Sequence, residues 1–309
     1  MNMKYIIALI AGFIACKSNS QVPKVSTGSI KLITQFKSNY VASRDIAVWL
    51  PENYSPSKKY AVLYMNDGKS LFDSTLMWNK QEWGVDEVLG RLMATHQIRD
   101  CIVVGIYNSG ATRHSEYCPQ KPFEMLKPAE QDSMYTARRK DHSIFFATKV
   151  FSDKYLKFIV EELKPFIDSS FSTYTDVANT FIAGSSMGGV NSWYAISEYP
   201  EVFGGAACLS IHWTGIYSDI NNPLPIAELN YLKSHIPSPN NHKLYFDYGT
   251  ETLDTLYKSY QVDADYIYKL TGYNDTNYFS KEFVGANHSE NAWRSRLDIP
   301  ILFLLGNKK

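Results

Sequence analysis

The sequence predicts an α/β fold: a mostly parallel, eight-stranded sheet with an antiparallel N-terminal edge and helices on both faces. Two observations support this prediction. Apolar runs of strand length recur along the chain, and from residue 60 onward amphipathic segments or long loops generally separate them. No helical segment lies between the first two runs, so these two strands are expected to pair antiparallel.

Hydrophobic periodicity places the individual elements. Strands are expected at Ile30–Phe36, Asp45–Leu50, Tyr60–Met65, Cys101–Ile106, Thr180–Ala183, Gly205–Ser210, Lys243–Tyr248 and Tyr278–Phe283. Helices are expected at Val85–Thr95, Lys154–Ile167, Gly188–Glu198, Tyr257–Leu270 and Ala292–Leu304. Because the chain shows no internal repeat and no low-complexity linker, we expect a single domain over residues 21–309.

A long polar segment near residues 107–153 interrupts this alternation. It contains the charged stretches Arg113–Tyr117 and Arg138–Asp141. Long loops in compact domains are often functional, and a loop that follows a sheet strand lies near the cleft at the carboxyl ends of the strands. We therefore expect a polar loop insertion, which either covers the cleft or is a solvated segment without a role.

The composition argues against several classes of function. Apolar residues make up 45% and charged residues 20%, as is ordinary for a soluble globular protein. The 31 basic and 31 acidic side chains cancel, and the basic ones form no stripe, so no nucleic-acid partner is expected. The seven histidines show no paired ligand spacing, so no metal site is expected.

The N-terminus resembles an export signal. Lys4 precedes an apolar run, Tyr5–Ala15, which is too short for the roughly twenty residues of a membrane helix. Residues 1–20 are thus predicted to be a signal peptide cleaved near Ser20–Gln21. Alternatively, Phe13–Cys16 loosely matches a lipobox, in which Cys16 would carry a lipid anchor. Both interpretations predict a bacterial protein that is secreted, periplasmic or an outer-surface lipoprotein.

The four cysteines do not form a disulfide framework. Besides Cys16 they are Cys101, Cys118 and Cys208, and none has Cys-x-x-Cys spacing. Cys101 and Cys208 lie at the edges of apolar strand-like runs and are expected in the core. At most one disulfide is possible among the three.

The most informative motif is the run Gly184–Gly189, which reads Gly-Ser-Ser-Met-Gly-Gly. It follows an expected strand and precedes an expected helix. A Gly-x-Ser-x-Gly sequence in this context is typical of a nucleophile elbow, where a serine is held on a strained turn at a helix N-terminus. The flanking glycines leave room for the sharp reversal of the chain. Ser186 is therefore the candidate nucleophile.

A serine nucleophile requires a base and an acid that orients the base. The predicted strand order describes an α/β-hydrolase sheet, in which the chain order is Ser, acid, His. His288 follows the last expected strand and precedes the last expected helix, so it is the candidate base. The loop after Lys243–Tyr248 offers Glu251 and Asp254, and we favour Asp254.

Backbone N–H groups must also stabilise the oxyanion that forms on the substrate. Met187, directly after the nucleophile, is expected to supply one, and Lys69 in an earlier strand-to-helix loop the other. Asp67 in the same loop, together with His212 and Trp213 after another strand, is expected to contact the substrate.

With these residues in place, the chain resembles the esterase D/enterochelin esterase-like branch of the α/β-hydrolases, which includes feruloyl esterases, S-formylglutathione hydrolase and mycolyltransferases. The resemblance covers most of the chain after residue 20. It is carried by Val48–Tyr54, Tyr64–Asp73, Val103–Asn108, Arg113, Glu116–Tyr117, Gly184–Gly189, His288, Glu290 and Trp293. Two positions depart from the pattern. Asn66 replaces a frequent histidine, and Thr252 occupies the usual position of the acid.

The resemblance implies ester hydrolysis by a Ser–His–acid triad without a metal or organic cofactor. We expect an exported serine esterase that acts on small-molecule or polysaccharide esters, such as acetyl or feruloyl groups on plant polysaccharide. A siderophore trilactone is the rival substrate. An acyltransferase that uses a sugar or lipid acceptor and a non-catalytic glycan-binding relative are the alternative functions.

Overall fold

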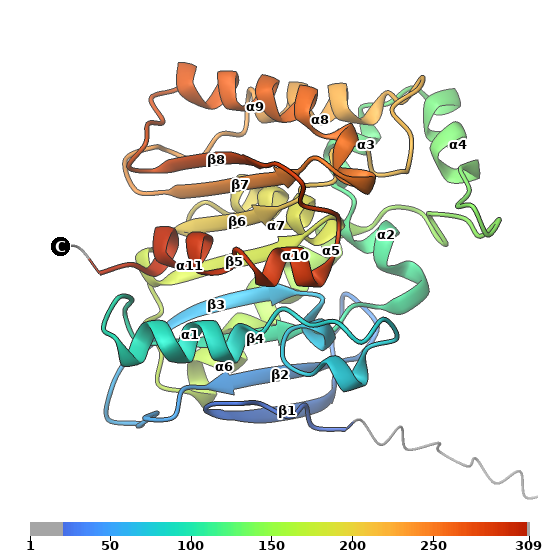
Figure 1. Ribbon diagram of the computed structural model, residues 1–309. Helices are drawn as coiled ribbons and strands as arrows, with labels where there is room; N and C mark the ends of the chain where they lie inside the picture. The colour runs from blue at the N-terminus through green and yellow to red at the C-terminus, as the bar shows by residue number, and fades with distance from the viewer. Residues whose placement is uncertain (1–20, 308–309) are drawn as a thin grey trace, which may run out of the picture.

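An eight-stranded sheet forms the centre of the computed structural model, which describes residues 21–307 (Figure 1). Its spatial order is β1 (Ser29–Phe36), β2 (Arg44–Leu50), β4 (Cys101–Ile106), β3 (Ala61–Asn66), β5 (Thr180–Ser185), β6 (Gly205–Leu209), β7 (Lys243–Gly249) and β8 (Tyr278–Phe283). Strand β2 pairs antiparallel with β1 and β4, and all other neighbours are parallel. The predicted fold class is confirmed.

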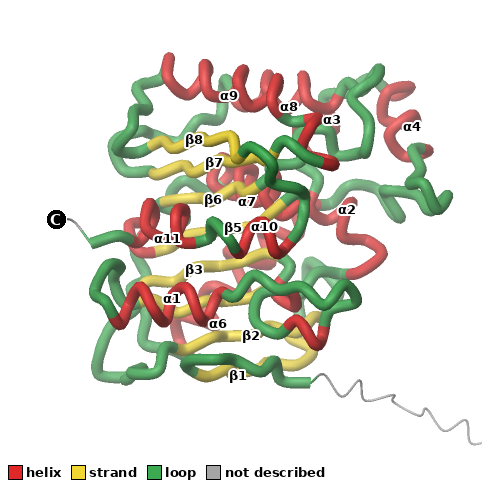
Figure 2. Tube along the Cα trace, in the orientation of Figure 1, coloured by secondary structure: helices red, strands yellow, loops and turns green. Residues whose placement is uncertain are grey.

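Helices cover both faces of the sheet (Figure 2). One face packs against α1 (Val85–Ala94), α10 (Glu290–Arg294) and α11 (Asp298–Leu305). The other packs against α5 (Ser152–Lys157), the π-helical turn η4 (Phe158–Leu163), α6 (Lys164–Ser170), α7 (Met187–Glu198), α8 (Leu224–Leu232) and α9 (Lys258–Leu270). Strands β2 to β6 are buried throughout, as expected for strands between two layers of helices.

The segment near residues 107–153 is folded rather than an irregular polar loop. It contains three short helices, α2 (Arg113–Tyr117), α3 (Gln120–Glu124) and α4 (Pro128–Thr136). Glu116 on α2 forms a buried ion pair with Arg44 on β2, in which the closest N–O distance is 2.6 Å. The Arg44 guanidinium also lies over the Tyr155 ring. The ion pair therefore joins this segment, called the insertion below, to the sheet.

Two expected helices need correction, and one helix was not expected. The expected helix Lys154–Ile167 is divided into α5, η4 and α6. The last expected helix is divided into α10 and α11, because Pro300 in the first turn of α11 has no N–H for a continuous helix. Helix α8 was not anticipated.

The structure also bears on the cysteines and on membrane-spanning helices. Cys101, Cys118 and Cys208 are free and buried, which confirms the core positions expected for the first and last. No helix between residues 21 and 307 is long and apolar enough to cross a membrane. The predicted signal peptide and Cys16 lie outside the described residues.

Candidate active site

Ser186 lies on a sharp turn between β5 and α7. Its backbone has φ 55° and ψ −126°, in a region that residues with a side chain rarely adopt. The turn is held from both sides, because the Ser186 N–H donates to the Leu209 carbonyl at 3.0 Å and the Ser186 carbonyl accepts from the His212 N–H at 3.3 Å. A Cβ atom at Gly184 would lie 2.6 Å from the Gly188 carbonyl, so only glycine fits there. The local geometry is that of the predicted elbow.

A cavity of about 470 Å³ opens above this turn. Its lining combines aromatic rings with basic and acidic side chains from distant parts of the chain. The lining residues are Asp67, Lys69, Ser70, Met77, Trp78, Trp83, Tyr107, Asn108, Gly110, Arg113, His114, Arg139, Ser185, Ser186, Tyr217, His288, Glu290 and Trp293. The structure thus places Ser186, His288 and Lys69 around one space.

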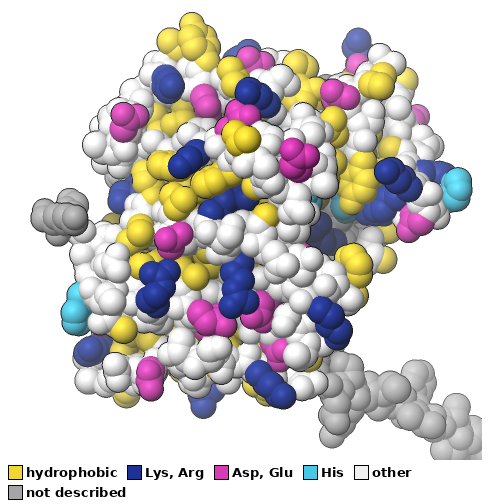
Figure 3. All heavy atoms as spheres, in the orientation of Figure 1, with side chains coloured by type: hydrophobic (Ala, Val, Ile, Leu, Met, Phe, Trp, Pro, Cys, Tyr) yellow, Lys and Arg dark blue, Asp and Glu magenta, His cyan; other side chains and the backbone are white. Residues whose placement is uncertain are grey.

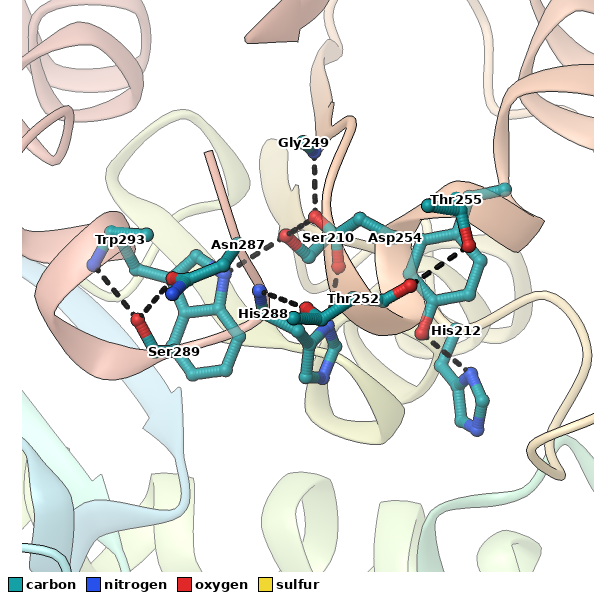
Figure 4. A network of polar contacts seen from close by, with 12 residues as sticks. Ser210, His212, Gly249, Thr252, Asp254, Thr255, Asn287, His288, Ser289 and Trp293 are labelled. Carbon is teal, nitrogen blue, oxygen red and sulfur yellow. Dashed lines mark hydrogen bonds and ion pairs between the residues drawn. The ribbon is translucent and has the colours of Figure 1, made fainter. Parts of the chain in front are cut away.

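His288 is held by the loop that follows β7. Its Nδ1 lies 2.5 Å from Oδ1 of Asp254, and its main-chain N–H donates to Oγ1 of Thr252 at 2.9 Å (Figure 4). An ionised carboxylate only accepts hydrogen bonds, so the proton of the neutral imidazole lies on Nδ1. The other ring nitrogen, Nε2, is then free to accept a proton.

The Asp254 carboxylate is buried with its hydrogen bonds satisfied. Its Oδ2 accepts from the Ser210 hydroxyl and from the Gly249 N–H, both at 2.6 Å. Burial by itself raises the pKa of this carboxyl. The hydrogen bonds from His288, Ser210 and Gly249 outweigh burial and hold the pKa of Asp254 below its ordinary value.

Ser210 is in turn fixed by two donors. Trp293 Nε1 lies 2.9 Å and an Arg296 terminal nitrogen 3.0 Å from the Ser210 hydroxyl oxygen. Arg296 forms a buried bidentate ion pair with Asp247, with N–O distances of 2.9 and 3.0 Å. Sequence reasoning missed Ser210 and Arg296, since no local pattern marks a contact between residues so far apart in the chain.

Glu251, the alternative acid, does not contact His288. Its side chain is exposed, and its main-chain N–H donates to the Ala286 carbonyl. Thr252, at the family's usual acid position, has φ 57° and binds the His288 backbone instead. The carboxylate that orients the imidazole therefore comes from Asp254, two residues later.

The loop after β3 carries Lys69 in the short helix η1 (Gly68–Ser70). Asp67 precedes it with φ 58°. The Asp67 carboxylate accepts two hydrogen bonds of 2.6 Å from Arg113 and one of 2.7 Å from Asn108. Asp67 lines the cavity, but its oxygens hold the loop instead of offering free acceptors to a substrate.

Asn66 connects this loop to the elbow. Its amide nitrogen donates to the Gly188 carbonyl at 3.0 Å, and its amide oxygen accepts from the Tyr155 hydroxyl at 2.7 Å. The loop is thereby fixed against the first turn of α7, which begins at Met187. The first N–H groups of a helix lack intrahelical acceptors, and Met187 is the first residue of α7.

The structure places the two predicted substrate contacts after β6 in different surroundings. Trp213 is fully buried, packs on Trp193 and donates its indole N–H to Gln261, so it is a core residue. His212 is 1% exposed and does not line the cavity directly. Its Nδ1 lies 2.7 Å from the Tyr257 hydroxyl.

Between residues 21 and 307, no group of three or more His, Cys, Asp or Glu side chains could hold a metal ion.

Comparison with known proteins shows the family. Residues 40–302 match the family model described as "Putative esterase". The chain belongs to this esterase family. Two curated relatives from Bacillus subtilis (strain 168) match over part of their length: "Uncharacterized protein YjcH" is 26% identical over 160 residues, which are 52% of each chain. "Uncharacterized protein YbbA" is 25% identical over 169 residues, which are 54% of this chain and 56% of the relative. The chain thus spans about half the length of these relatives.

Solved structures of esterases share the fold. A ferulic acid esterase superposes with a TM-score of 0.62 at 18% identity, covering 90% of this chain and 98% of the other. The enterobactin esterase FES from Shigella flexneri gives 0.59 at 16% identity, covering 92% and 61%. An IroE-like serine hydrolase from Shewanella oneidensis gives 0.62 at 18% identity, covering 89% and 79%. The predicted α/β-hydrolase fold is confirmed, and the family match agrees with the esterase resemblance of the sequence.

Proposed function

We propose that this protein is an exported serine esterase that hydrolyses carboxylic esters through an acyl-enzyme. The observation that supports it best is the chain of contacts around the cavity. Ser186 is held on a strained turn, His288 lines the same space, and Asp254 binds the far side of the imidazole. This is the order of groups that a hydroxyl nucleophile requires.

In the first half of the reaction, Ser186 Oγ forms a bond to the ester carbonyl carbon while His288 Nε2 takes its proton. Asp254 stabilises the imidazolium that results. The N–H groups of Met187 and Lys69 receive the negative charge on the carbonyl oxygen. As the C–O bond of the ester breaks, His288 gives its proton to the leaving alcohol.

In the second half, a water molecule attacks the acyl carbon and gives a proton to His288. The bond to Ser186 then breaks, and Oγ recovers the proton from the imidazolium. The carboxylic acid leaves, and the free enzyme is restored. No metal or organic cofactor enters either half.

We assign acetyl or feruloyl esters of plant polysaccharide as the substrate class. The open cavity is lined by Trp78, Tyr107 and Tyr217, which offer flat apolar surfaces to an aromatic acyl group. The ferulic acid esterase among the solved structures supports this assignment. Basic residues in the cavity also favour a second candidate, a siderophore trilactone, which carries many oxygen acceptors. Export is inferred from the signal-like pattern in residues 1–20.

The test is hydrolysis of p-nitrophenyl acetate, followed by a panel of acetylated xylan, methyl ferulate and a siderophore lactone. Ser186→Ala should lower kcat by about 10⁴-fold or more, because the nucleophile is lost. A Ser186→Ala protein with wild-type turnover would overturn the assignment. An increase in transfer product with added sugar acceptor would instead indicate an acyltransferase.

A further inference from the structure

Two buried histidines lie beside the cavity and take no part in the proposed reaction. His114 on α2 is 7% exposed and His212 is 1% exposed, and their ring centroids are 6.5 Å apart with nearly perpendicular planes. His114 lines the cavity together with Ser186. The main-chain N–H of His212 donates to the Ser186 carbonyl. His114 therefore borders the cavity that holds the nucleophile, and the backbone of His212 is bonded to that of Ser186.

The hydrogen bond at Nδ1 defines the tautomer of His114. Arg139 places a terminal nitrogen 3.1 Å from Nδ1 of His114, and a guanidinium only donates, so Nδ1 accepts and Nε2 carries the proton. Nδ1 of His212 lies 2.7 Å from the Tyr257 hydroxyl and 3.3 Å from the Thr214 hydroxyl, and a hydroxyl can either donate or accept.

Burial lowers the pKa of His114 and of His212 well below the ordinary value, so both rings are neutral. The Nε2 atoms of both rings are buried and have no hydrogen-bond partner in the described part of the chain. A buried donor without an acceptor costs free energy, and folded proteins keep few of them. The unpaired Nε2–H of His114, with the unpartnered Nε2 of His212 on the neighbouring ring, indicates a missing ligand atom at this place.

The charge around these donors indicates what kind of acceptor fits. Arg139 lines the cavity and forms no ion pair within residues 21–307, and its guanidinium rests on the Phe145 ring at 4.6 Å. Arg113, in contrast, is neutralised by Asp67. Lys and Arg side chains gather around the hollow between the segment after α4 and the body of the molecule (Figure 3). This end of the cavity thus combines the unpaired N–H of His114 with a guanidinium that forms no ion pair within residues 21–307.

We propose that His114, His212 and Arg139 form a subsite for a carboxylate on the part of the ester that is remote from the reacting carbonyl. The inference rests on the proposed esterase function and names a feature of its substrate. A carboxylate supplies several acceptor positions and pairs well with a guanidinium. Tyr217, which is 51% exposed and packs on Phe145 and His212, lines the cavity beside the subsite. Because the Nε2 atoms are buried, a side chain beside them has to move before the carboxylate can reach them.

The experiment compares matched esters in two arms. One arm places the carboxylate on the acyl side, with mono-p-nitrophenyl succinate against p-nitrophenyl butyrate. The other places it on the alcohol side, with 4-acetoxybenzoate against methyl 4-acetoxybenzoate. In each pair the ratio of kcat/KM for the charged and neutral esters is measured. Comparing this ratio between wild-type and variant proteins cancels the intrinsic reactivities of the esters.

Arg139→Gln and His114→Phe should each lower the ratio by about tenfold or more in one arm, because a charge-assisted hydrogen bond is lost. The loss should appear mainly as a higher KM for the charged ester. Arg138→Gln is the matched control, since Arg138 is exposed and does not line the cavity. It should leave both ratios at the wild-type value.

The outcomes separate this inference from the proposed function. The protein could cleave the neutral esters in a Ser186-dependent way while Arg139→Gln leaves the charged-to-neutral ratio of kcat/KM unchanged. That result would overturn the subsite, and the proposed esterase function would still stand. If wild-type protein cleaves none of the esters, the proposed function fails. Calorimetry with succinate and with benzoate, on wild-type and Arg139→Gln proteins, then tests the carboxylate subsite without turnover. Equal or absent binding by both proteins would refute it. Because Arg139 is only partly buried, its variant tests the subsite even if His114→Phe does not fold.

Discussion

The two ends of the candidate active site differ in how their buried polar atoms are satisfied. At the acid end, around Asp254, both carboxylate oxygens accept hydrogen bonds (Figure 4). Ser210 and Arg296 are each bound to further partners. At the insertion end, the buried Nε2 atoms of His114 and His212 have no hydrogen-bond partner among residues 21–307. A hydrogen-bond network in which every group is paired holds a side chain in one position, whereas unpaired buried polar atoms can bind a ligand. The network around Asp254 therefore orients the catalytic imidazole, and the unpaired atoms at the insertion end select the substrate.

The largest expected effect tests the acid end. Asp254→Asn replaces the carboxylate with an amide that no longer favours the Nδ1-protonated imidazole of His288. We expect kcat to fall by about 10³- to 10⁴-fold on every ester, charged or neutral. Steady-state kinetics on both matched pairs checks this. Glu251→Gln is the control and should stay close to wild type, because Glu251 is exposed. An equal loss in Glu251→Gln would contradict the assignment of the acid.

The next effect concerns the support beneath the acid. Arg296→Met leaves Asp247 buried without its ion-pair partner, so we expect the free energy of unfolding to fall by about 3–5 kcal/mol. Urea unfolding measures it. Arg294→Met offers a matched comparison two residues away, where the ion pairs with Glu82 and Glu87 are partly exposed. That change should cost no more than about 1 kcal/mol. Similar losses of unfolding free energy in the two variants would show that the buried ion pair contributes no more to stability than the partly exposed ones.

A smaller effect is expected from Ser210→Ala, which removes one donor to Asp254. At neutral pH we expect a loss of about 1–3 kcal/mol in unfolding free energy. The folded-state pKa of Asp254 is depressed, so its contribution is present above the ordinary carboxyl pKa and is lost as the pH falls through the folded value. Removing the donor raises that folded-state pKa.

The difference between wild type and Ser210→Ala should therefore narrow below about pH 4, near the ordinary Asp pKa. Urea unfolding at pH 7 and at pH 3 tests this. A difference that stays constant between the two pH values would mean that Ser210 acts through packing and not through the carboxylate. The ratio of charged to neutral ester turnover should remain at its wild-type value, in contrast to Arg139→Gln.

Much of the fold follows from local sequence. Strands buried between two helical layers form continuous apolar runs, and β4 and β8 begin and end where periodicity places them. Ser186 and His288 could be found because chain order and the glycine spacing restrict where they lie. Helices α2 and α3 of the insertion could not be found, since five residues show no reliable period.

The remaining parts of the site depend on contacts between distant segments. Whether Glu251 or Asp254 faces His288 is decided by the backbone of Thr252, whose positive φ no local pattern predicts. His212 and Trp213 are neighbours, yet one lies against His114 near the cavity and the other packs in the core. Arg296 contacts Ser210 across 86 positions of the chain. Sequence periodicity carries no information about such pairs.

The ion pair between Arg44 and Glu116 has a consequence for protein engineering. This buried ion pair connects the sheet to the insertion, the segment that would determine substrate specificity. A transplant of this segment into another scaffold must bring an arginine at the matching position of the second strand, or it would introduce a buried carboxylate without compensation. Chimeras between relatives should therefore exchange the two positions together.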